Sequence, residues 1–578
     1  MVDGPHSTVE MPPTRRRYAS KWLTLVLCEA VMMSSGTLYL FPIYSPSLKR
    51  SLDLTQEQVN FIGSCSHFGA FFSVFGGLFF DSFGARATLG LGGALKLIGL
   101  GLTYGILAGS LGNNTQNLAA FAAWLFGTGC STSLTASLGA NYATFRDRTV
   151  HGRLVGLLLS FFGLSSGVIS LTYDVFFTDP VSFVKYVAVC AGGVDLLSAS
   201  VVGAPKHLAL PPEETIPMGN TGTAHDCKTS FRAFFQPASQ ESKLTRGQAA
   251  CAMTATATAL TAVLLAASDS SELTAIVCLL GITWLLGAQI YTLLVGSGKL
   301  TYKRNEMEAV DATGSEQSKR DLAKGFTQIT PTQLFFSFDF YLLFVALLLG
   351  LGSGITVINN LAQMVSAFPE LQSDKAGGFS HGLLKLLACA NTLGRLASGS
   401  VSDTLSSSGK TTRAEFTVWL FIAMAGGMAV LAVLPDGAPS PFLVLGVSII
   451  GASFGALFWA MPTLVMELFG SKHFGANRGI VGLSPAIGGW LLSTKLAGAV
   501  YAANAHDGVE CIEKSACYRT SWICNFFVSV VAVGLCSVLA RRDKRRQNNV
   551  SGKQMGNAGS SVSNTGAQYH TRQGSPFQ

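Results

Sequence analysis

One short stretch decides the fold of this chain: Gly76-Gly77-Leu78-Phe79-Phe80-Asp81-Ser82-Phe83-Gly84-Ala85-Arg86. A second stretch in the other half has a similar form: Gly394-Arg395-Leu396-Ala397-Ser398-Gly399-Ser400-Val401-Ser402-Asp403. In both, an aspartate follows a glycine by four positions, and each stretch closes a strongly apolar segment. A polar turn that ends an apolar helix at the same place in two halves predicts a membrane protein built from two related bundles.

The composition supports a membrane protein. Of the 578 residues, 49% are hydrophobic and only 12% are charged, whereas soluble domains carry about 25% charged residues. Such a deficit makes sense only if much of the surface faces the lipid bilayer. The net charge is +8, but the basic residues stand in short blocks between apolar segments. That distribution indicates membrane topology and disfavours a nucleic-acid partner.

Counting apolar segments gives the expected organisation, because about 20 apolar residues cross a bilayer once. The expected order is a cytosolic tail, a six-helix bundle, linkers that flank an extra helical hairpin, a second six-helix bundle and a disordered cytosolic tail. We therefore predict an all-α polytopic protein, with the major divisions at 1–21, 22–203, 204–337 (hairpin at about 248–295), 338–540 and 541–578. The individual spans are expected near 22–44, 58–80, 87–109, 118–140, 154–176, 182–203, 248–268, 272–295, 338–360, 379–402, 415–434, 441–466, 478–503 and 521–540.

The placement of Lys and Arg predicts the orientation. Basic residues concentrate in alternate loops, in both linkers and in the tail, so both termini are expected in the cytosol. No cleavable signal peptide is visible, and the first span would itself direct the chain to the membrane. Asn113 opens a glycosylation sequon in a short non-cytosolic loop, and its occupancy stays open.

Cys511 and Cys517 lie in one polar loop on the predicted non-cytosolic side, where disulfides can form. A disulfide across this loop and a pair of free thiols are both compatible with the sequence. Metal binding is disfavoured, because no partner ligands stand nearby.

The repeated stretches suggest gates. Asp81 can pair with Arg86 or with the positive N-terminus of a neighbouring helix, and Arg395 with Asp403 would form the equivalent contact in the second half. Such contacts can hold the cytosolic side closed in one state and break in another. The alternative is that these residues only anchor helix ends in the headgroup layer.

Ionisable residues inside spans are costly and are therefore candidates for a substrate or proton site. Lys385 and Lys495 stand at similar depth and could converge on an anion, whereas buried pairing or snorkelling remains the alternative for every candidate. Asp195 is a weaker candidate, because its span is expected on the outer face of the bundle. The substrate and proton candidates are Glu29, His67, Asn359, Asn360, Lys385 and Lys495.

Glu29 and His67 are the expected proton carriers, because a buried carboxylate or an imidazole can titrate in the physiological range. Asn359 and Asn360 follow a glycine-rich stretch that either exposes backbone groups to a substrate or allows close helix packing. The chain has no P-loop, HExxH, GxSxG or paired CxxC motif, so the sequence predicts neither an enzyme nor a cofactor or metal.

Several stretches together resemble the nodulin-like branch of the major facilitator superfamily, which includes fungal monocarboxylate-transporter homologues. The Asp81 to Arg86 loop is similar to the superfamily's cytosolic signature, although Ser82 stands where a basic residue is common. The extra hairpin exceeds the twelve-helix pattern. The other similar stretches are Gly36 to Lys49, Gly352 to Asn360, Ser484 to Gly489 with Leu496 to Tyr501, and Cys511 to Tyr518.

This resemblance implies a secondary active transporter that moves a small solute by alternating access. The membrane lysines favour an organic anion, and the resemblance implies a solute such as a monocarboxylate. Proton coupling is left open. A receptor or scaffold with the same fold and no flux is the competing hypothesis. We also expect a monomer in the bilayer, and the resemblance favours a vacuole-like internal membrane over the plasma membrane.

Overall fold

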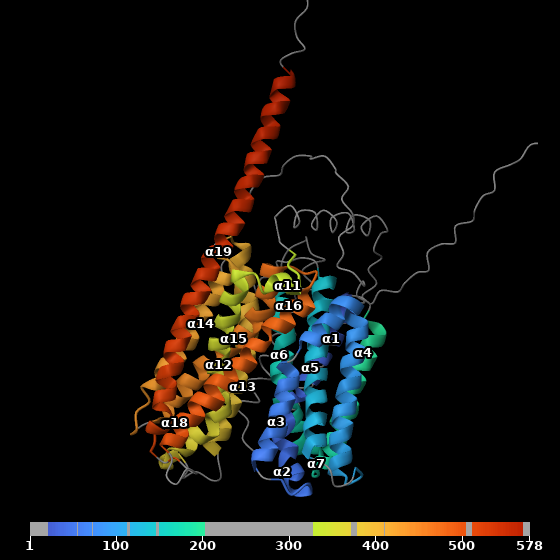
Figure 1. Cartoon of the computed structure of the whole chain (residues 1–578), viewed down its shortest axis with the longest axis vertical. Coiled ribbons are helices and arrows are strands. Elements are labelled where there is room, and N and C mark those ends of the chain that lie inside the picture. Colours follow the sequence, from blue (N-terminus) through green and yellow to red (C-terminus); the bar gives the residue numbers. More distant parts are fainter. Residues whose placement is uncertain are drawn as a thin grey trace, which may run out of the picture.

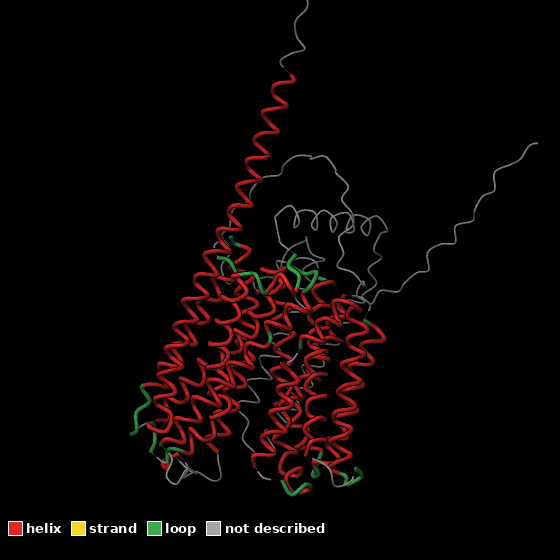
Figure 2. The backbone as a smooth tube through the Cα atoms, viewed as in Figure 1, coloured by secondary structure: helices red, strands yellow, loops and turns green. Residues whose placement is uncertain are grey.

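The computed structural model describes residues 21–202 and 328–569, apart from short gaps at 55, 72, 112–115, 146–149, 372–377, 410, 438, 505–510 and 512. Every regular element in these residues is a helix. The helices run roughly parallel to one long direction and form two groups side by side, one from each half of the chain (Figures 1 and 2). The predicted hairpin at about 248–295 and the Asn113 sequon lie outside the described residues.

The N-terminal group begins with a broken span. The first helix changes to a 3-10 turn at Gly36 and then continues as a separate helix. A second break lies at Gly84, whose φ of 76° and ψ of 178° divide one long helix into two legs. Only glycine adopts this conformation readily, so the residue type accounts for the sharp turn at Gly84. The elements are α1 (Lys21–Ser35), η1 (Gly36–Leu40), α2 (Phe41–Ser51), α3 (Gln56–Phe71), α4 (Val74–Leu107), α5 (Gln116–Thr144), α6 (His151–Phe176) and α7 (Pro180–Val201).

The C-terminal group also consists mainly of long helices. Its next-to-last span is segmented, with a π-helical stretch in the middle, and Pro485 lies in the segment before that stretch. The elements are α11 (Pro331–Leu334), α12 (Phe338–Ser366), η4 (Pro369–Leu371), α13 (Gly378–Ser407), α14 (Arg413–Ala432), α15 (Pro439–Phe469), α16 (Phe474–Val481), α17 (Leu483–Gly488), η6 (Gly489–Ala497), α18 (Gly498–Ala503) and α19 (Ala516–Tyr569).

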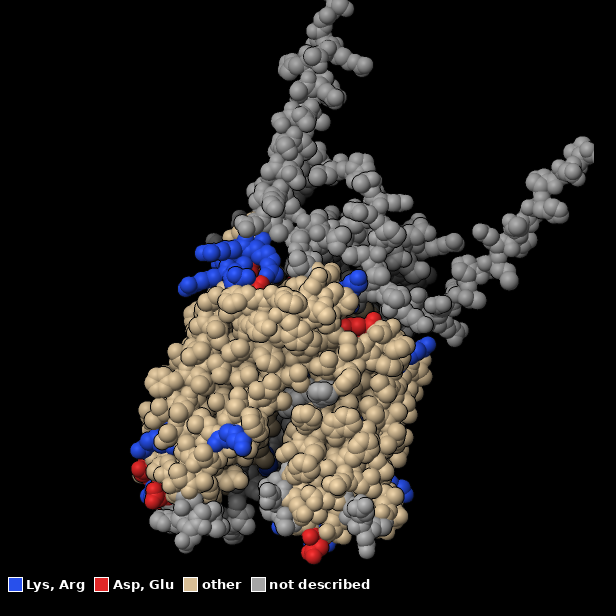
Figure 3. Space-filling model, viewed as in Figure 1, with Lys and Arg blue, Asp and Glu red and all other residues tan. Residues whose placement is uncertain are grey.

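The surface of these helices is that of a membrane protein. Among the described residues, seven helices are long and apolar enough to span a bilayer, or eight when the bent pair at the N-terminus is counted. Most of α3 and the whole of α4 count there as one helix, Phe61–Leu107, while α5 and α13 have the length but carry more polar residues. On the face drawn in Figure 3, Lys, Arg, Asp and Glu gather mainly at the two ends and uncharged residues cover most of the middle.

The two groups meet along two helix pairs: α4 packs against α16, and α6 packs against α13. Glycines allow this close approach. A Cβ on Gly77 would lie 2.0 Å from the carbonyl oxygen of Gly475, and one on Gly399 would lie 2.3 Å from that of Gly152. Small residues at helix crossings are the usual means of bringing two membrane helices together.

The C-terminal end differs from the expectation of a disordered tail from residue 541. The last helix, α19, continues to Tyr569. A membrane-spanning helix already supplies the nucleus, and each further residue then adds a hydrogen bond without a new nucleation step. The Arg, Lys and Gln residues that follow the span are also good helix formers.

Candidate functional site

A cavity lies between the two bundles. Its empty volume is about 710 Å³, including space open to solvent. Most of the lining is apolar, and both halves of the chain contribute to it. The lining residues are Leu38, His67, Ala70, Ser73, Cys130, Ser131, Leu134, Leu138, Leu159, Phe162, Phe458, Met461, Pro462, Arg478, Gly482 and Pro485.

Two basic side chains, His67 from α3 and Arg478 from α16, stand among the described lining residues. His67 is exposed, as expected for an imidazole at an open cavity. Arg478 is buried, with a side chain only 6% exposed. Its guanidinium donates to Oγ1 of Thr135 at 2.6 Å, and its Nε has no hydrogen-bond acceptor among the described residues.

Arg395 lies behind the aromatic part of the cavity wall. Its guanidinium carbon is 5.7 Å from the ring centre of Phe162 and 5.3 Å from that of Phe458. It also donates to the carbonyl oxygen of Leu159 at 2.7 Å, so it joins α13 to α6. The expected contact between Arg395 and Asp403 is absent, because eight residues separate them by about 12 Å along the helix.

Asp81 joins the first bundle to α16, which lies at the end of the molecule that carries α11 and the emerging part of α19 (Figure 1). Its carboxylate accepts hydrogen bonds from the backbone N–H groups of Gly475 at 2.9 Å and Ala476 at 2.8 Å. Both belong to the first turn of α16. Arg86 has a different role, since it donates to the carbonyl oxygens of Ala199 and Ser200 at the end of α7. Of the two partners considered for Asp81, the structure therefore shows the helix N-terminus.

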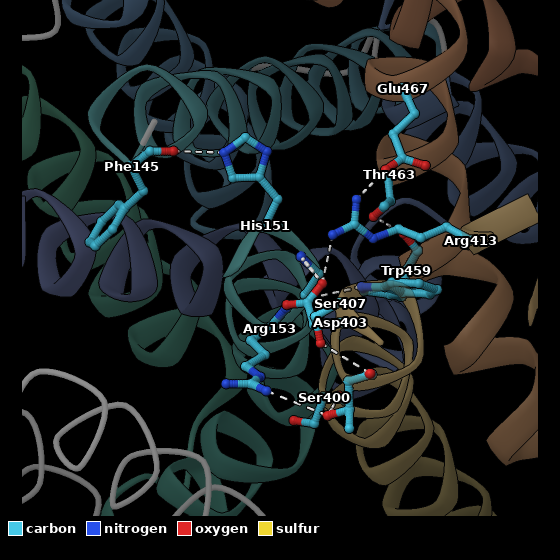
Figure 4. A network of polar contacts seen from close by, with 12 residues as sticks. Phe145, His151, Arg153, Ser400, Asp403, Ser407, Arg413, Trp459, Thr463 and Glu467 are labelled. Carbon is cyan, nitrogen blue, oxygen red and sulfur yellow. Dashed lines mark hydrogen bonds and ion pairs between the residues drawn. The ribbon is translucent and has the colours of Figure 1, made fainter. Parts of the chain in front are cut away.

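Asp403 makes the equivalent contact from the other half. It accepts from the N–H groups of Gly152 at 3.0 Å and Arg153 at 2.8 Å, in the first turn of α6 (Figure 4). Arg413 pairs with the same carboxylate at 2.7 Å and also with Glu467.

Each bundle thus supplies an aspartate that caps a helix of the other bundle. The N-terminus of a helix carries partial positive charge and unpaired N–H groups, so a carboxylate there is stabilised. We call the Asp81–α16 and Asp403–α6 contacts the two interbundle caps. Both lie at the same end of the molecule and close the bundles against each other there.

A buried ion pair lies inside the N-terminal bundle. Nζ of Lys96 in α4 is 2.8 Å from the carboxylate of Asp195 in α7, and both side chains are fully buried. Ser34 and Ser35, at the end of α1, accept hydrogen bonds from Lys96, and Ser34 also donates to Asp195. The side chain of Asp195 is therefore buried against Lys96, within the span that we expected on the outer face of the bundle. Glu29, also in α1, is buried with a side chain 1% exposed.

The other sequence candidates lie away from the cavity lining. Lys495 is exposed and its Nζ stands 5.4 Å from the ring centre of Trp490, while Lys385 is half-buried on α13. Neither lines the cavity, so the predicted convergence on an anion is absent from the described contacts. Asn359 and Asn360 both donate to the hydroxyl of Ser493, at 3.1 and 3.3 Å.

Cys511 and Cys517 form a disulfide, one of the two arrangements that the sequence allowed. The N–H of Cys511 donates to the hydroxyl of Tyr501 at 3.1 Å. The disulfide and this hydrogen bond together tie the start of α19 to the end of α18. Nearby, hydrogen bonds from Ser515 hold the pKa of Asp436 below its usual range.

Comparison with known proteins places the first bundle in a family. Residues 21–214 match the family described as Nodulin-like. The chain carries a nodulin-like domain. Its relatives include the "Probable transporter MCH1" of Saccharomyces cerevisiae, 25% identical over 42% of this chain. The alignment spans only 50% of the yeast protein. "Protein NUCLEAR FUSION DEFECTIVE 4" of Arabidopsis thaliana is 23% identical over 90% of this chain and 89% of its own length.

Solved structures show the fold. Double-tryptophan mutants of XylE give a TM-score of 0.54 at 12% identity, over 90% of this chain and 95% of theirs. FucP, a major facilitator superfamily transporter in the outward conformation, gives 0.50 at 13% identity, over 90% and 99%. The chain therefore has the major facilitator fold.

Arg478 is the site residue that the sequence interpretation missed. The sequence predicts a span that begins at 478, which places Arg478 at the edge of the membrane. The helix begins earlier, at Phe474, which brings Arg478 inside the protein. A usable signal was the Gly-Ala pair before it, since Gly475 and Ala476 suit a helix start in close contact with a neighbour.

Proposed function

We propose that this nodulin-like protein is a secondary transporter for a small organic anion of the monocarboxylate class. The buried guanidinium of Arg478 at the cavity wall carries this proposal. Among the described residues it has no carboxylate partner, and Thr135 is its hydrogen-bond acceptor. A cation inside a membrane protein is costly unless it is paired, so this arginine favours an anionic ligand.

The rest of the cavity suits the other end of such a solute. Leu134, Leu138, Phe162, Phe458 and Met461 offer apolar contact to a short hydrocarbon chain. A guanidinium can hold a carboxylate with two parallel hydrogen bonds, which fixes the orientation of the solute. One charged group in a mainly apolar pocket is a common design for a small-molecule site.

Transport would proceed by alternating access. The two interbundle caps close one end of the cavity, and breaking them would open that end while the opposite end closes. His67 lines the same cavity and could carry the coupled proton, because an imidazole changes charge near neutral pH. The relatives named as probable transporters support movement of solute over a receptor role.

Uptake of radiolabelled pyruvate and lactate into proteoliposomes, with and without an inward proton gradient, tests this function. For Arg478→Gln we expect saturable uptake to fall by at least about tenfold, because the anion loses a charge-assisted contact. Lys495→Gln is the matched control, since it removes one cation from an exposed position of the same segmented span. Saturable uptake by that control should stay within about twofold of uptake by the parent protein.

Equal uptake by Arg478→Gln and the parent protein would contradict the role of this arginine. An absence of flux for all anions in a broad metabolite mixture, together with ligand-dependent capture of a partner protein, would favour the receptor or scaffold hypothesis. A stronger uptake under the proton gradient that disappears in His67→Gln would support coupling through this imidazole.

The orientation and location are part of the same proposal. We place both termini in the cytosol, on the distribution of Lys and Arg, and favour a vacuole-like internal membrane by resemblance. A tag at each end, probed by a protease in intact organelles, tests the first point. Imaging of the tagged protein tests the second.

A further inference from the structure

The last helix has one face that meets lipid. Its large exposed apolar residues recur three or four positions apart, which places them in one stripe. Such a stripe on the outside of a membrane bundle contacts the hydrocarbon core. The residues are Ile523, Phe527, Val530, Val531 and Val538, with 41% to 61% of each exposed.

Two arginines continue this stripe beyond the apolar region. At about 100° per residue, Arg545 falls within about 20° of Val538 around the helix axis, and Arg541 within about 60°. Both arginines are exposed. Asp543, which points in the opposite direction, is buried with a side chain 7% exposed. The two guanidinium groups therefore emerge on the lipid-facing side, at the level where the apolar stripe ends.

The neighbouring cations are already engaged by the protein. Arg542 and Arg546 both pair with Asp339 at the start of α12. Lys544 pairs with Glu415 at the start of α14, at 2.7 Å. Within the part of the chain that the structure describes, Arg541 and Arg545 have no such acidic partner. The ion pairs fix the rotation of α19 and so hold these two arginines outward.

Exposed aromatic side chains border the same place. Phe336 is 91% exposed and Phe338 is 58% exposed, and the guanidinium of Arg542 stands 5.2 Å from the ring centre of Phe338. Exposed aromatic rings at the end of a membrane helix mark the level of the lipid headgroups. Figure 3 shows Lys and Arg side chains gathered at this corner, where α19 leaves the bundle in Figure 1.

We propose that Arg541 and Arg545 bind the phosphate headgroup of an anionic phospholipid in the leaflet on this side. The guanidinium fork matches phosphate oxygens, and two such groups one helical turn apart can hold one headgroup between them. The acyl chains of that lipid would lie along the apolar stripe from Val538 toward Phe527. Charge and hydrocarbon contact are thus supplied by one face of one helix.

Binding of lipid to the purified full-length protein in detergent tests this site. The probe is short-chain phosphatidylglycerol, and its binding is followed by the rise in apparent Tm. Parallel titrations use phosphatidylcholine of equal chain length and inorganic phosphate. We expect Arg541→Gln/Arg545→Gln to raise the half-maximal phosphatidylglycerol concentration by about tenfold or more. The matched control, Lys495→Gln/Arg519→Gln, removes two cations elsewhere and should shift it by less than about twofold.

The titrations also decide the source of the phosphate. A lipid site requires that phosphatidylglycerol stabilise the protein and that phosphatidylcholine and inorganic phosphate do so weakly. Equal stabilisation by either of these two compounds would overturn the proposal. So would an unchanged titration in Arg541→Gln/Arg545→Gln, which would leave the arginines as topology signals only.

Discussion

At the scale of single residues, the described structure places its buried charges in paired or hydrogen-bonded positions. Lys96 and Asp195 neutralise each other, and the hydroxyls of Ser34 and Ser35 satisfy further hydrogen bonds of the pair. The cluster stands where α1 gives way to η1 at Gly36, and Leu38 of η1 lines the cavity. The ion pair therefore fixes the end of a helix that leads directly to the proposed binding site.

Removing one member of this pair should be more damaging than removing both. Lys96→Met leaves a buried carboxylate without its cation, a change that costs about 3–5 kcal/mol. The double variant Lys96→Met/Asp195→Asn leaves no buried charge and keeps an acceptor for Ser34. We therefore expect the apparent Tm in detergent to fall strongly in Lys96→Met and to recover in the double variant.

Asp195→Asn alone is the second arm of this cycle, since it leaves the ammonium group unpaired. Additive losses in the double variant would show that the two side chains do not interact energetically.

At the scale of elements, helix N-termini and glycine contacts hold the two bundles together at one end of the molecule. Each interbundle cap combines an aspartate with a helix N-terminus, and each lies one helical turn from a glycine that touches the opposite backbone. The carboxylate can reach the N–H groups only while the two backbones are in contact. Closure thus depends on a small residue and a charged residue acting together.

A side chain at Gly77 should hold this end open. In Gly77→Val, the new Cβ would lie 2.0 Å from the carbonyl oxygen of Gly475, which forces α4 and α16 apart. We expect a cysteine placed at Leu138, in the cavity wall, to react faster with a membrane-impermeant maleimide applied from the side that bears the caps.

Gly534→Val serves as the control for that measurement. A Cβ at Gly534 meets no atom within 4 Å, so the labelling rate should match the parent protein. An unchanged rate in Gly77→Val as well would show that this contact does not govern access.

The sequence predicted the helices better than the contacts between them. Apolar length located the start of α12 and both ends of α6 to within about three residues, because the bilayer dictates that length. The sharp turn at Gly84 also followed from residue type. The partner of Asp195 could not be predicted, since rotation of a helix about its axis depends on packing between bundle members. Because this rotation could not be predicted, the sequence interpretation included Lys495 among the site candidates and omitted Arg478.

At the scale of the whole molecule, the structure is asymmetric between its two ends. The interbundle caps close the end that bears α11. At the opposite end the surface is hollowed between the two halves in Figure 3.

In the absence of solute, the cavity should therefore be accessible only from the side opposite the interbundle caps. A His67→Cys variant should react with an impermeant maleimide from the side opposite the interbundle caps, at a rate above that of the parent protein. A saturating transported anion should slow this reaction, because it would occupy the cavity that His67 lines. Faster labelling from the side of the caps would contradict the assignment of the closed end.

The reciprocity of the two caps has a consequence for assembly. Asp81 completes a helix of the second half, and Asp403 completes a helix of the first. Neither half contains the acceptor for its own exposed helix start. Suppose that the chain were divided between the bundles and the two fragments synthesised separately. Each fragment would then carry the aspartate that caps a helix N-terminus of the other. The two fragments would then recognise each other by complementation, and the joint would form in one register only.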